Sequence, residues 1–238
     1  MTLKSKVALV TGGAVRIGEA ICRALAAEGV RVVIHCRRSK TEAVALAKEM
    51  GGLVVQSDLN SELSCERLME QTVHKAGRLD ILVNNAAVFH KDSLRNVSGQ
   101  KLLDEFWPNL FAPILLMRAF AAQARRGNIV NLLDRRIASL DVSSVSYVLT
   151  KKALAELTRM AALELAPGIT VNGVAPGGIL PPSGKGMKYL HDKAGPAPLK
   201  RQATPRDVAE AVVFLLRSDS ITGQIIFVDG GQNLMGNL

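Results

Sequence analysis

Short apolar runs alternate with segments of helical periodicity along most of the chain. The runs are three or four residues long, at 7–10, 32–34, 53–55, 81–83, 129–132, 169–171 and 225–228. Nearly continuous apolar strands are typical of sheets that are buried on both faces. Their alternation with helices predicts a parallel sheet connected by right-handed crossovers. The expected fold is therefore a doubly wound α/β sheet of about seven strands with helices on both faces.

The helical segments and loops complete this pattern. Helices are expected at about 41–50, 61–75 and 146–165, and a long helical region before residue 129 is expected to break near Pro108 and Pro113. A last helix should begin at Thr204 and Pro205, which suit the N-cap and the first turn. No internal repeat and no long linker divides the sequence, so residues 1–238 are expected to form a single domain.

The charge of the chain is positive and uneven. The 238 residues carry a formal charge of +9, and 48% of them are hydrophobic, which excludes a disordered chain. Residues 1–50 hold 9 basic and 4 acidic side chains, and residues 151–200 hold 7 and 3. A basic protein of this kind binds nucleic acid in some cases, with an affinity that falls steeply with salt. Because the sequence has no zinc-finger spacing and no basic helical arm, a small polyanionic ligand such as a dinucleotide explains the charge with fewer assumptions, and no nucleic-acid partner is expected.

The sequence gives no sign of a membrane protein or of a metalloprotein. No apolar stretch approaches the ~20 residues of a membrane span, and the N-terminus does not resemble a signal peptide. Cys22, Cys36 and Cys65 have no metal-ligand spacing, and such a sparse, odd number of cysteines suggests free thiols in a reducing compartment. We therefore expect a cytoplasmic protein without a metal and without a membrane partner.

A glycine-rich turn follows the first expected strand. The segment Thr11-Gly12-Gly13-Ala14-Val15-Arg16-Ile17-Gly18 lies between that strand and the first helix. Glycines at such a turn let the backbone approach a pyrophosphate, whose charge is stabilised by the N-terminus of the helix. The position of the turn predicts a Rossmann-type dinucleotide site, in which Arg16 also reaches the phosphates.

The end of the second strand indicates which dinucleotide binds. NAD sites usually place a carboxylate here for the ribose 2′-hydroxyl, whereas NADP sites use arginine for the 2′-phosphate. This strand ends in His35-Cys36-Arg37-Arg38-Ser39, with no acidic residue between Glu28 and Glu42. The guanidinium groups suit a phosphate, so NADP(H) is predicted. Asp58 after the third strand is placed to accept a hydrogen bond from adenine, or to cap a helix.

Tyr147 and Lys151 are four residues apart in an expected helix and therefore share one face. An ammonium group beside a phenol favours the phenolate and should lower the pKa of the phenol from about 10. A phenol tuned in this way can give a proton to a carbonyl or imine while hydride arrives from the cofactor. The pair alone is a weak signal, but its place in a nucleotide-binding α/β chain favours catalysis.

Taken together, these motifs resemble the short-chain dehydrogenase/reductase family over nearly the whole chain. The matching segments also include Asn84-Asn85-Ala86, Asn109-Leu110-Phe111-Ala112-Pro113, Pro176-Gly177, Thr222-Gly223-Gln224 and Val228-Asp229-Gly230-Gly231. The resemblance implies that Tyr147 is the acid/base, that Lys151 binds the nicotinamide ribose and tunes Tyr147, and that Asn109 holds a water of a proton relay. It also implies a homodimer or homotetramer.

Two departures from the family pattern point to one branch. Asp134 stands where the family usually has a serine, 13 residues before the tyrosine, and Arg16 replaces the middle glycine of the turn. Both features, together with the segment 35–39 and Phe89, resemble the pteridine reductase branch, which reduces a pterin ring with NADPH. A carboxyl at position 134 can bind the ring nitrogens and amino group of a pterin and can carry a proton. Its structural alternatives are a turn cap or an ion pair with Arg135 or Arg136.

The sequence thus predicts a complete set of site residues. The predicted catalytic residues are Tyr147, Lys151, Asp134 and Asn109, and the predicted substrate-binding residues are Phe89, Asp134 and Tyr147. The predicted cofactor-binding residues are Gly12, Arg16, Ile17, Gly18, His35, Arg37, Arg38, Ser39, Asp58, Leu59, Asn85, Ala86, Ala87, Tyr147, Lys151, Pro176, Gly177 and Ile179. A substrate loop is expected at 180–200, with Tyr189 as a packing or lid residue.

Three other functions remain open at this point. The first is an NADPH-dependent carbonyl reductase acting on an oxoacyl thioester or a xenobiotic ketone. The feature in its favour is that Ala87 and Ile179 lack the hydroxyls associated with pterin contacts. The second is a non-catalytic NADP-binding regulator, against which Asn109, Tyr147 and Lys151 argue. The third is nucleic-acid binding. The leading hypothesis is an NADPH-dependent pteridine reductase acting on dihydropteridine or dihydrofolate-like C=N bonds.

Overall fold

A computed structural model describes residues 2–181, 184, 186, 188 and 197–235. Its strands form one parallel sheet of seven in the order β3-β2-β1-β4-β5-β6-β7. The strands are β1 (Val7–Val10), β2 (Arg31–Cys36), β3 (Leu53–Gln56), β4 (Ile81–Asn84), β5 (Gly127–Leu132), β6 (Ile169–Pro176) and β7 (Ile225–Val228). The predicted doubly wound Rossmann-type fold is confirmed.

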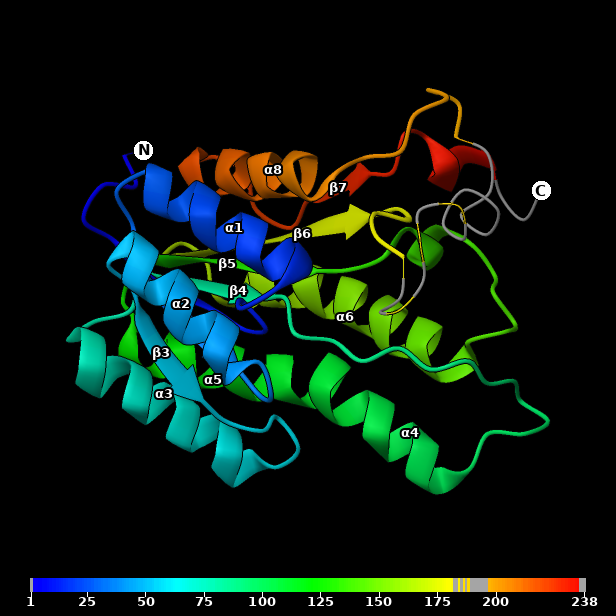
Figure 1. The fold of residues 1–238 in the computed structure, drawn as a ribbon, viewed down its shortest axis with the longest axis horizontal. Coiled ribbons are helices and arrows are strands. Elements are labelled where there is room, and N and C mark those ends of the chain that lie inside the picture. The colour runs from blue at the N-terminus through cyan, green and yellow to red at the C-terminus, as the bar shows by residue number, and fades with distance from the viewer. Residues whose placement is uncertain (1, 182–183, 185, 187, 189–196, 236–238) are drawn as a thin grey trace.

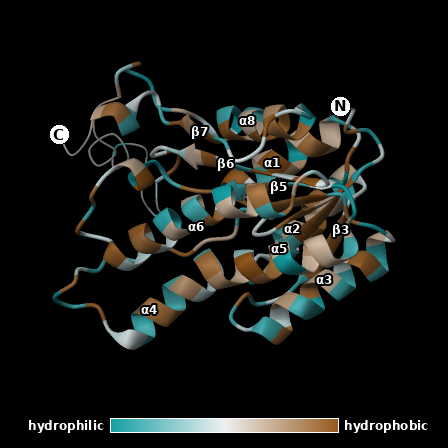
Figure 2. Ribbon diagram, turned by 180° about the vertical axis from the view of Figure 1, so that it is seen from behind, coloured by the Kyte–Doolittle hydropathy of each residue, from teal (hydrophilic) through white to brown (hydrophobic). Residues whose placement is uncertain are grey.

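Helices cover both faces of the sheet (Figure 1). One layer contains α1 (Arg16–Ala27), α2 (Lys40–Met50) and α8 (Pro205–Arg217), and the other contains α3 (Glu62–Ala76), α5 (Ala112–Gln123) and α6 (Val145–Glu164). Successive residues of a strand serve opposite layers, as in β1, where Ala8 packs against the first layer and Leu9 against the second. The apolar residues of the strands and of the helix sides that face them appear brown in Figure 2.

The sequence analysis expected the helical region before β5 to break near Pro108 and Pro113, and this expectation is wrong. It runs through α4 (Gly99–Phe106), a π-helical turn (Trp107–Phe111) and then α5. Pro108 lies within the π-turn and Pro113 lies in the first turn of α5. Because a proline has no N–H to donate, each is tolerated where the bonding pattern changes. The prolines therefore mark a change of helix type and do not end the helix.

Strand β6 is longer than its apolar run predicted. The run ends at Val171, but the strand continues through Asn172 and Gly173 to Pro176. The buried Asn172 side chain donates to the Ile221 carbonyl at 2.9 Å and accepts from the Gln224 amide at 3.0 Å. A buried polar side chain is tolerated when it is hydrogen-bonded, so Asn172 does not end the strand. The longer strand carries Pro176 and Gly177 to the carboxyl edge of the sheet.

Other features of the chain add to this description. Cys22, Cys36 and Cys65 are buried free thiols. Thr204 caps α8 through its side chain, and Pro205 begins the helix, as predicted. None of the helices in the described part of the chain is long and apolar enough to cross a membrane. Most of the predicted substrate loop at 180–200, including Tyr189, lies outside the described residues.

Candidate active site

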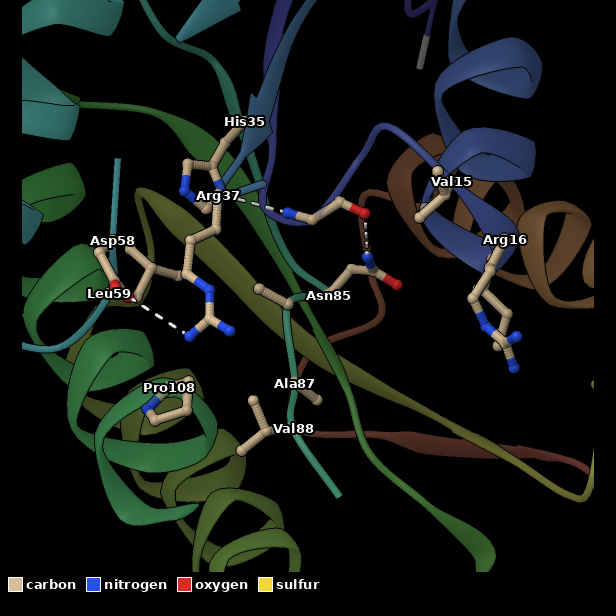
Figure 3. A pocket seen from close by; sticks show the side chains of 14 residues that line it. Val15, Arg16, His35, Arg37, Asp58, Leu59, Asn85, Ala87, Val88 and Pro108 are labelled. Carbon is tan, nitrogen blue, oxygen red and sulfur yellow. Dashed lines mark hydrogen bonds and ion pairs between the residues drawn. The ribbon is translucent and has the colours of Figure 1, made fainter. Parts of the chain in front are cut away.

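A cavity of about 340 Å³ opens at the carboxyl ends of β1 to β4 (Figure 3). The strand order reverses between β1 and β4, and ligands of doubly wound folds bind at this switch point. The cavity is lined by Gly12, Val15, Arg16, Ile17, Gly18, His35, Arg37, Asp58, Leu59, Asn85, Ala86, Ala87, Val88 and Pro108. Eleven of these were predicted from the sequence, whereas Val15, Val88 and Pro108 were not.

The glycine turn lies at one side of this cavity. Gly18 is in close contact with the turn, since a Cβ at this position would lie 2.1 Å from the Gly12 carbonyl oxygen. Helix α1 begins after Val15, which has no side-chain acceptor, so the first N–H groups of the helix are not capped by that residue. These N–H groups border the cavity and suit an anionic phosphate.

Arg16 explains why a glycine is common at its position. Its φ is +59°, in the left-handed region that glycine adopts without strain and most side chains avoid. The exposed guanidinium donates to the Leu180 carbonyl at 3.4 Å, which connects the glycine turn to the start of the predicted substrate loop. Arg16 therefore combines a strained backbone with a cation at the rim of the cavity.

His35 joins the carboxyl ends of three strands. Its Nδ1 accepts a hydrogen bond from the Gly12 amide at 3.1 Å, and its Nε2 lies 3.2 Å from the Ser57 carbonyl oxygen. Burial lowers the pKa of this imidazole to about 4, so the ring is neutral near pH 7. His35 lines the cavity as predicted, but both of its nitrogens are used by the protein backbone, and its main role is to hold the glycine turn.

This arrangement predicts that stability depends on pH through His35. The folded-state pKa is about 4 against an ordinary 6.5, so the unfolded chain takes up the proton first as the pH falls. The free energy of unfolding should decrease between about pH 6.5 and 4, by about 3 kcal/mol. Urea unfolding at several pH values measures this slope, and His35→Gln should flatten it. The control variant, His74→Gln at an exposed site on α3, should keep the slope; the same slope in both variants would contradict the assignment.

The residues after β2 and β3 form the far side of the cavity. Arg37 Nη1 lies 3.7 Å from Asp58 Oδ1, and both side chains line the cavity (Figure 3). Arg38 is exposed and does not line it. Ser39 precedes α2 as its N-cap residue and also lies outside the cavity lining. The structure therefore separates Arg37, which faces the expected ligand site, from its two predicted neighbours.

Asn85 and Thr11 hold β1 and β4 together at the same edge. The Asn85 amide group donates to the carbonyl oxygens of Thr11 at 2.8 Å and Gly12 at 3.1 Å. The Thr11 hydroxyl accepts from the backbone amides of Asn85 at 2.9 Å and Ala86 at 3.0 Å. Ala86 is small enough to approach Gly12 closely, since a Cβ on Gly12 would lie 3.0 Å from its Cα. These contacts fix the position of the cavity floor.

The predicted residues after β6 do not reach the cavity lining. Gly177 donates to the Val228 carbonyl at 3.0 Å, and a Cβ there would lie 2.9 Å from the Cβ of Asp229. Ile179 is buried in the core beneath α1 and α8. Together with Pro176, these residues form the edge of the sheet that leads into the predicted substrate loop.

Helix α6 brings the predicted catalytic residues together. Its start is fixed by the buried Asp92, whose carboxylate accepts from the backbone amide and the hydroxyl of Ser146. Tyr147 and Lys151 are both buried on this helix. The Tyr147 hydroxyl donates to Asp134 Oδ2 at 3.1 Å, and the Lys151 ammonium donates to the Leu132 carbonyl at 2.7 Å. Tyrosine, lysine and aspartate thus form one cluster, as predicted.

The electrostatics of Tyr147 differ from the sequence expectation. Burial and the adjacent Asp134 raise the pKa of the Tyr147 phenol well above 10. The ammonium of Lys151 lies 5.8 Å from the centroid of the tyrosine ring and is not bonded to the hydroxyl. Burial lowers the pKa of Lys151 to about 8. The prediction that lysine lowers the phenol pKa is therefore wrong for this structure, and Tyr147 holds its proton, as a proton donor must.

Asp134 caps a short helix and also contacts Tyr147. Its Oδ1 accepts from the Arg136 amide at 2.8 Å, which caps the short 3₁₀ helix at Arg135–Ala138, and Oδ2 lies 3.2 Å from Arg136 Nη1. Oδ2 also accepts from Tyr147, so the capping position of Asp134 leaves it in contact with the predicted proton donor. Arg136 is anchored on its other side by Asp141, at 2.9 Å.

Phe89 lies against this cluster. Its ring meets that of Tyr147 edge to face at 4.9 Å, and the Arg136 guanidinium lies 5.2 Å from its centroid. The side chain remains 42% exposed, so it presents an aromatic surface beside the predicted proton donor. This is the place that the sequence analysis assigned to a planar substrate ring.

The Asn109 side chain is occupied by the protein itself. Its Oδ1 accepts from the Val88 amide at 2.8 Å, and its Nδ2 donates to the Val88 carbonyl at 2.9 Å and to Glu105 Oε2 at 2.8 Å. Both amide protons are therefore used. Pro113 cannot donate an α-helical hydrogen bond to the Asn109 carbonyl four residues before it. The relay water predicted for Asn109 would therefore need an acceptor or donor other than this side chain.

Known proteins resemble this chain over nearly its whole length. A family model described as enoyl-(acyl carrier protein) reductase matches residues 13–233. Pteridine reductase 1 of Leishmania tarentolae is 34% identical over 278 residues, which cover 96% of this chain and 96% of that protein. The chain belongs to the short-chain dehydrogenase/reductase family. The resemblance seen in the sequence is confirmed, and the protein is an oxidoreductase of this family.

Other members of the short-chain dehydrogenase/reductase family are equally similar. Glucose and ribitol dehydrogenase homolog 2 of Arabidopsis thaliana is 35% identical over 248 residues, covering 96% of this chain and 86% of that protein. The crystal structure of FolM alternative dihydrofolate reductase 1 from Brucella canis, complexed with NADP, has a TM-score of 0.93 and 34% identity, covering 98% of this chain and 96% of that chain. The names agree on dehydrogenase or reductase and differ in substrate, so family membership supplies the reaction class.

Proposed function

We propose that the protein is an NADPH-dependent pteridine reductase that reduces C=N bonds of dihydropteridines or dihydrofolate-like compounds. The observation that carries the proposal is the hydrogen bond from the Tyr147 hydroxyl to Asp134, beside the exposed ring of Phe89. A pterin has a flat ring that stacks on an aromatic side chain and N–H groups that a carboxylate accepts. The similarity to pteridine reductase 1 and to the NADP-bound FolM structure supports the same substrate class.

NADP(H) fits the residues of the cavity. The glycine turn and the N-terminus of α1 suit the pyrophosphate, and Arg37 suits the 2′-phosphate because β2 ends without an acidic residue. Asp58 borders the same end of the cavity and suits the adenine amino group. For Arg38 and Ser39 to contact the phosphate as predicted, the turn that carries them has to rearrange around the ligand.

The residues of the cluster divide the chemistry of one reduction. NADPH supplies a hydride to the carbon of the C=N bond. The Tyr147 phenol, which holds its proton because its pKa is raised, gives that proton to the nitrogen. Asp134 accepts from the phenol and has further lone pairs for substrate N–H groups. The Lys151 ammonium, which donates to the Leu132 carbonyl, suits the ribose hydroxyls of the cofactor.

Asp134 allows the substrate class to be tested. Asp134→Ser should reduce turnover of a dihydropteridine by about 10- to 100-fold and should affect a simple ketone less, because a serine satisfies a carbonyl but not a row of N–H donors. Steady-state rates with both substrates measure the difference. Asp141→Asn is the matched control, since Asp141 also pairs with Arg136 but not with Tyr147. Equal losses on the two substrates would favour the carbonyl reductase.

A carbonyl reductase is the second candidate. Ala87, which lines the cavity, and Ile179, which is buried, both lack hydroxyl groups that could contact a pterin. An oxoacyl thioester or a xenobiotic ketone needs fewer polar contacts than a pterin does. The same Tyr147 and Lys151 would serve such a substrate, and Asp134 would then act mainly as the cap of its turn.

The assembly and location of the protein remain predictions. Met160 and Leu163 on α6 are 66% and 84% exposed, which supports the predicted homodimer or homotetramer because large exposed apolar side chains favour a partner surface. The predicted cytoplasmic location rests on the free cysteines and on the N-terminal sequence.

A further inference from the structure

Glu105 is a fully buried carboxylate that the proposed chemistry does not use. It lies on α4, one helical turn before Asn109, and its exposed fraction is 0%. Its Oε2 accepts from the Asn109 side chain at 2.8 Å. Its Oε1 accepts from the His90 backbone amide at 2.6 Å and lies 2.9 Å from His90 Nδ1. Burying a carboxylate is costly, so its retention here calls for a specific role.

The contacts of Glu105 meet in the segment that carries Phe89. Val88 is held at its amide and its carbonyl by the Asn109 side chain, which Glu105 holds in turn. His90 is held at its amide by Glu105 directly. Phe89 lies between these two fixed residues, and its ring contacts Tyr147. The backbone on both sides of Phe89 is therefore fixed to one carboxylate.

His90 connects the buried Glu105 carboxylate to the surface of the protein. The His90 side chain is 57% exposed, while that of Glu105 is 1% exposed. The other titratable groups that interact with Glu105 are Tyr147 and Lys151 on α6, whose pKa values the Glu105 charge raises. Burial raises the pKa of Glu105, and the His90 imidazole and the Asn109 amide act against that change. The charge of Glu105 thus interacts both with the exposed His90 and with the predicted catalytic residues Tyr147 and Lys151.

We propose that Glu105 and His90 are positioning residues that hold Phe89 in place for the ring of an aromatic substrate. The proposal rests on the proposed function for its substrate class. Glu105 affects substrate binding by holding Phe89. His90 sets the pH range in which Glu105 stays ionised and holds the segment around Phe89. Protonation of Glu105 removes an acceptor from a site where three donors converge, which loosens the segment.

Glu105→Gln is the first test because it keeps the size of the side chain. A glutamine has one oxygen, so its NH₂ group must face either the Asn109 amide or the His90 donors. We expect the KM for dihydropteridine to rise by about tenfold or more, as a misplaced contact residue predicts. The Tm, measured by thermal unfolding, reports whether the variant folds. Asp104→Asn, on the same helix and bonded to Gln100 only through its side chain, is the matched control.

A double-mutant cycle separates positioning from general destabilisation. In a Phe89→Ala background, Glu105→Gln should change the KM by less than about twofold, because the residue through which it acts is missing. The same multiplication of KM in both backgrounds would overturn the proposal. If Glu105→Gln fails to fold, the cycle is run with His90→Gln, which changes an exposed side chain.

A titration without substrate tests the same claim independently of the proposed function. Trp107 is the single tryptophan of the chain. It begins the π-turn and stands between Glu105 and Asn109 in the sequence. Its emission should show an acid-side transition that moves to higher pH in His90→Gln, since the imidazole no longer opposes protonation, and that is absent in Glu105→Gln. A transition unchanged in Glu105→Gln would overturn the inference. A wild type that turns over no dihydropteridine would contradict the proposed function, and the titration would still decide the role of Glu105.

Discussion

Tyr147→Phe should lose most turnover, by about 10²- to 10⁴-fold, while it keeps its affinity for NADPH. The hydroxyl that the substitution removes is the group that donates to Asp134, and the ring and its contact with Phe89 are retained. Because its pKa is raised, this phenol carries a proton near pH 7, and the substitution removes that proton donor. Initial rates of NADPH oxidation and a fluorescence titration with NADPH measure the two quantities.

The control for this variant is the other tyrosine of the chain. Tyr189→Phe removes a phenol from the predicted substrate loop and should keep turnover within a few-fold of the wild type. A Tyr147→Phe variant that remains active, or one that loses NADPH binding to the same degree, would contradict the role of the phenol as proton donor.

Arg37→Ala should weaken NADPH binding by about 10- to 100-fold, as the loss of a charge-assisted hydrogen bond predicts, and should leave NADH binding nearly unchanged. Arg37 lines the cavity at the end of β2, and β2 itself ends without the acidic residue that would bind a ribose 2′-hydroxyl. Dissociation constants for both cofactors, measured by titration, give the ratio. The 2′-phosphate is the group that distinguishes them, so the change must appear in that ratio.

Arg38→Ala is the matched control because Arg38 is the adjacent arginine and lies outside the cavity lining. It should have the smaller effect, although the sequence alone treated the two arginines as equal. Equal losses in the two variants would show that the turn rearranges around the ligand. Comparable affinities of the wild type for NADPH and NADH would contradict the predicted cofactor preference.

Much of the fold could be predicted because its signals are local. The apolar runs and the glycine turn gave the order of strands and helices, and buried parallel strands need little else to be recognised. The errors occurred where a side chain acts over a distance. Asn172 looked like the end of a strand until its hydrogen bonds with residues 221 and 224 were known. The π-turn at Trp107–Phe111 has no simple sequence signal, and its prolines resembled helix breaks.

The candidate site divides in the same way. The structure brings Tyr147, Lys151 and Asp134 close together, because residues at the ends of adjacent parallel strands and on one helix face meet at one edge of the sheet. Motif spacing gave the wrong direction for the Tyr147 pKa shift, because that shift depends on burial and on the adjacent Asp134 carboxylate. Glu105 was missed because no periodicity distinguishes a buried glutamate from a solvated one on the same helix.

The most direct test of the central claim is the initial rate of NADPH oxidation by the wild-type enzyme with dihydrobiopterin, dihydrofolate and an oxoacyl thioester, each assayed under the same conditions. The tyrosine–aspartate pair beside Phe89 predicts that one of the two ring substrates has the highest kcat/KM and that Asp134→Ser reduces this value most. A higher kcat/KM for the thioester, with the ring substrates left unreduced, would contradict the assignment as a pteridine reductase.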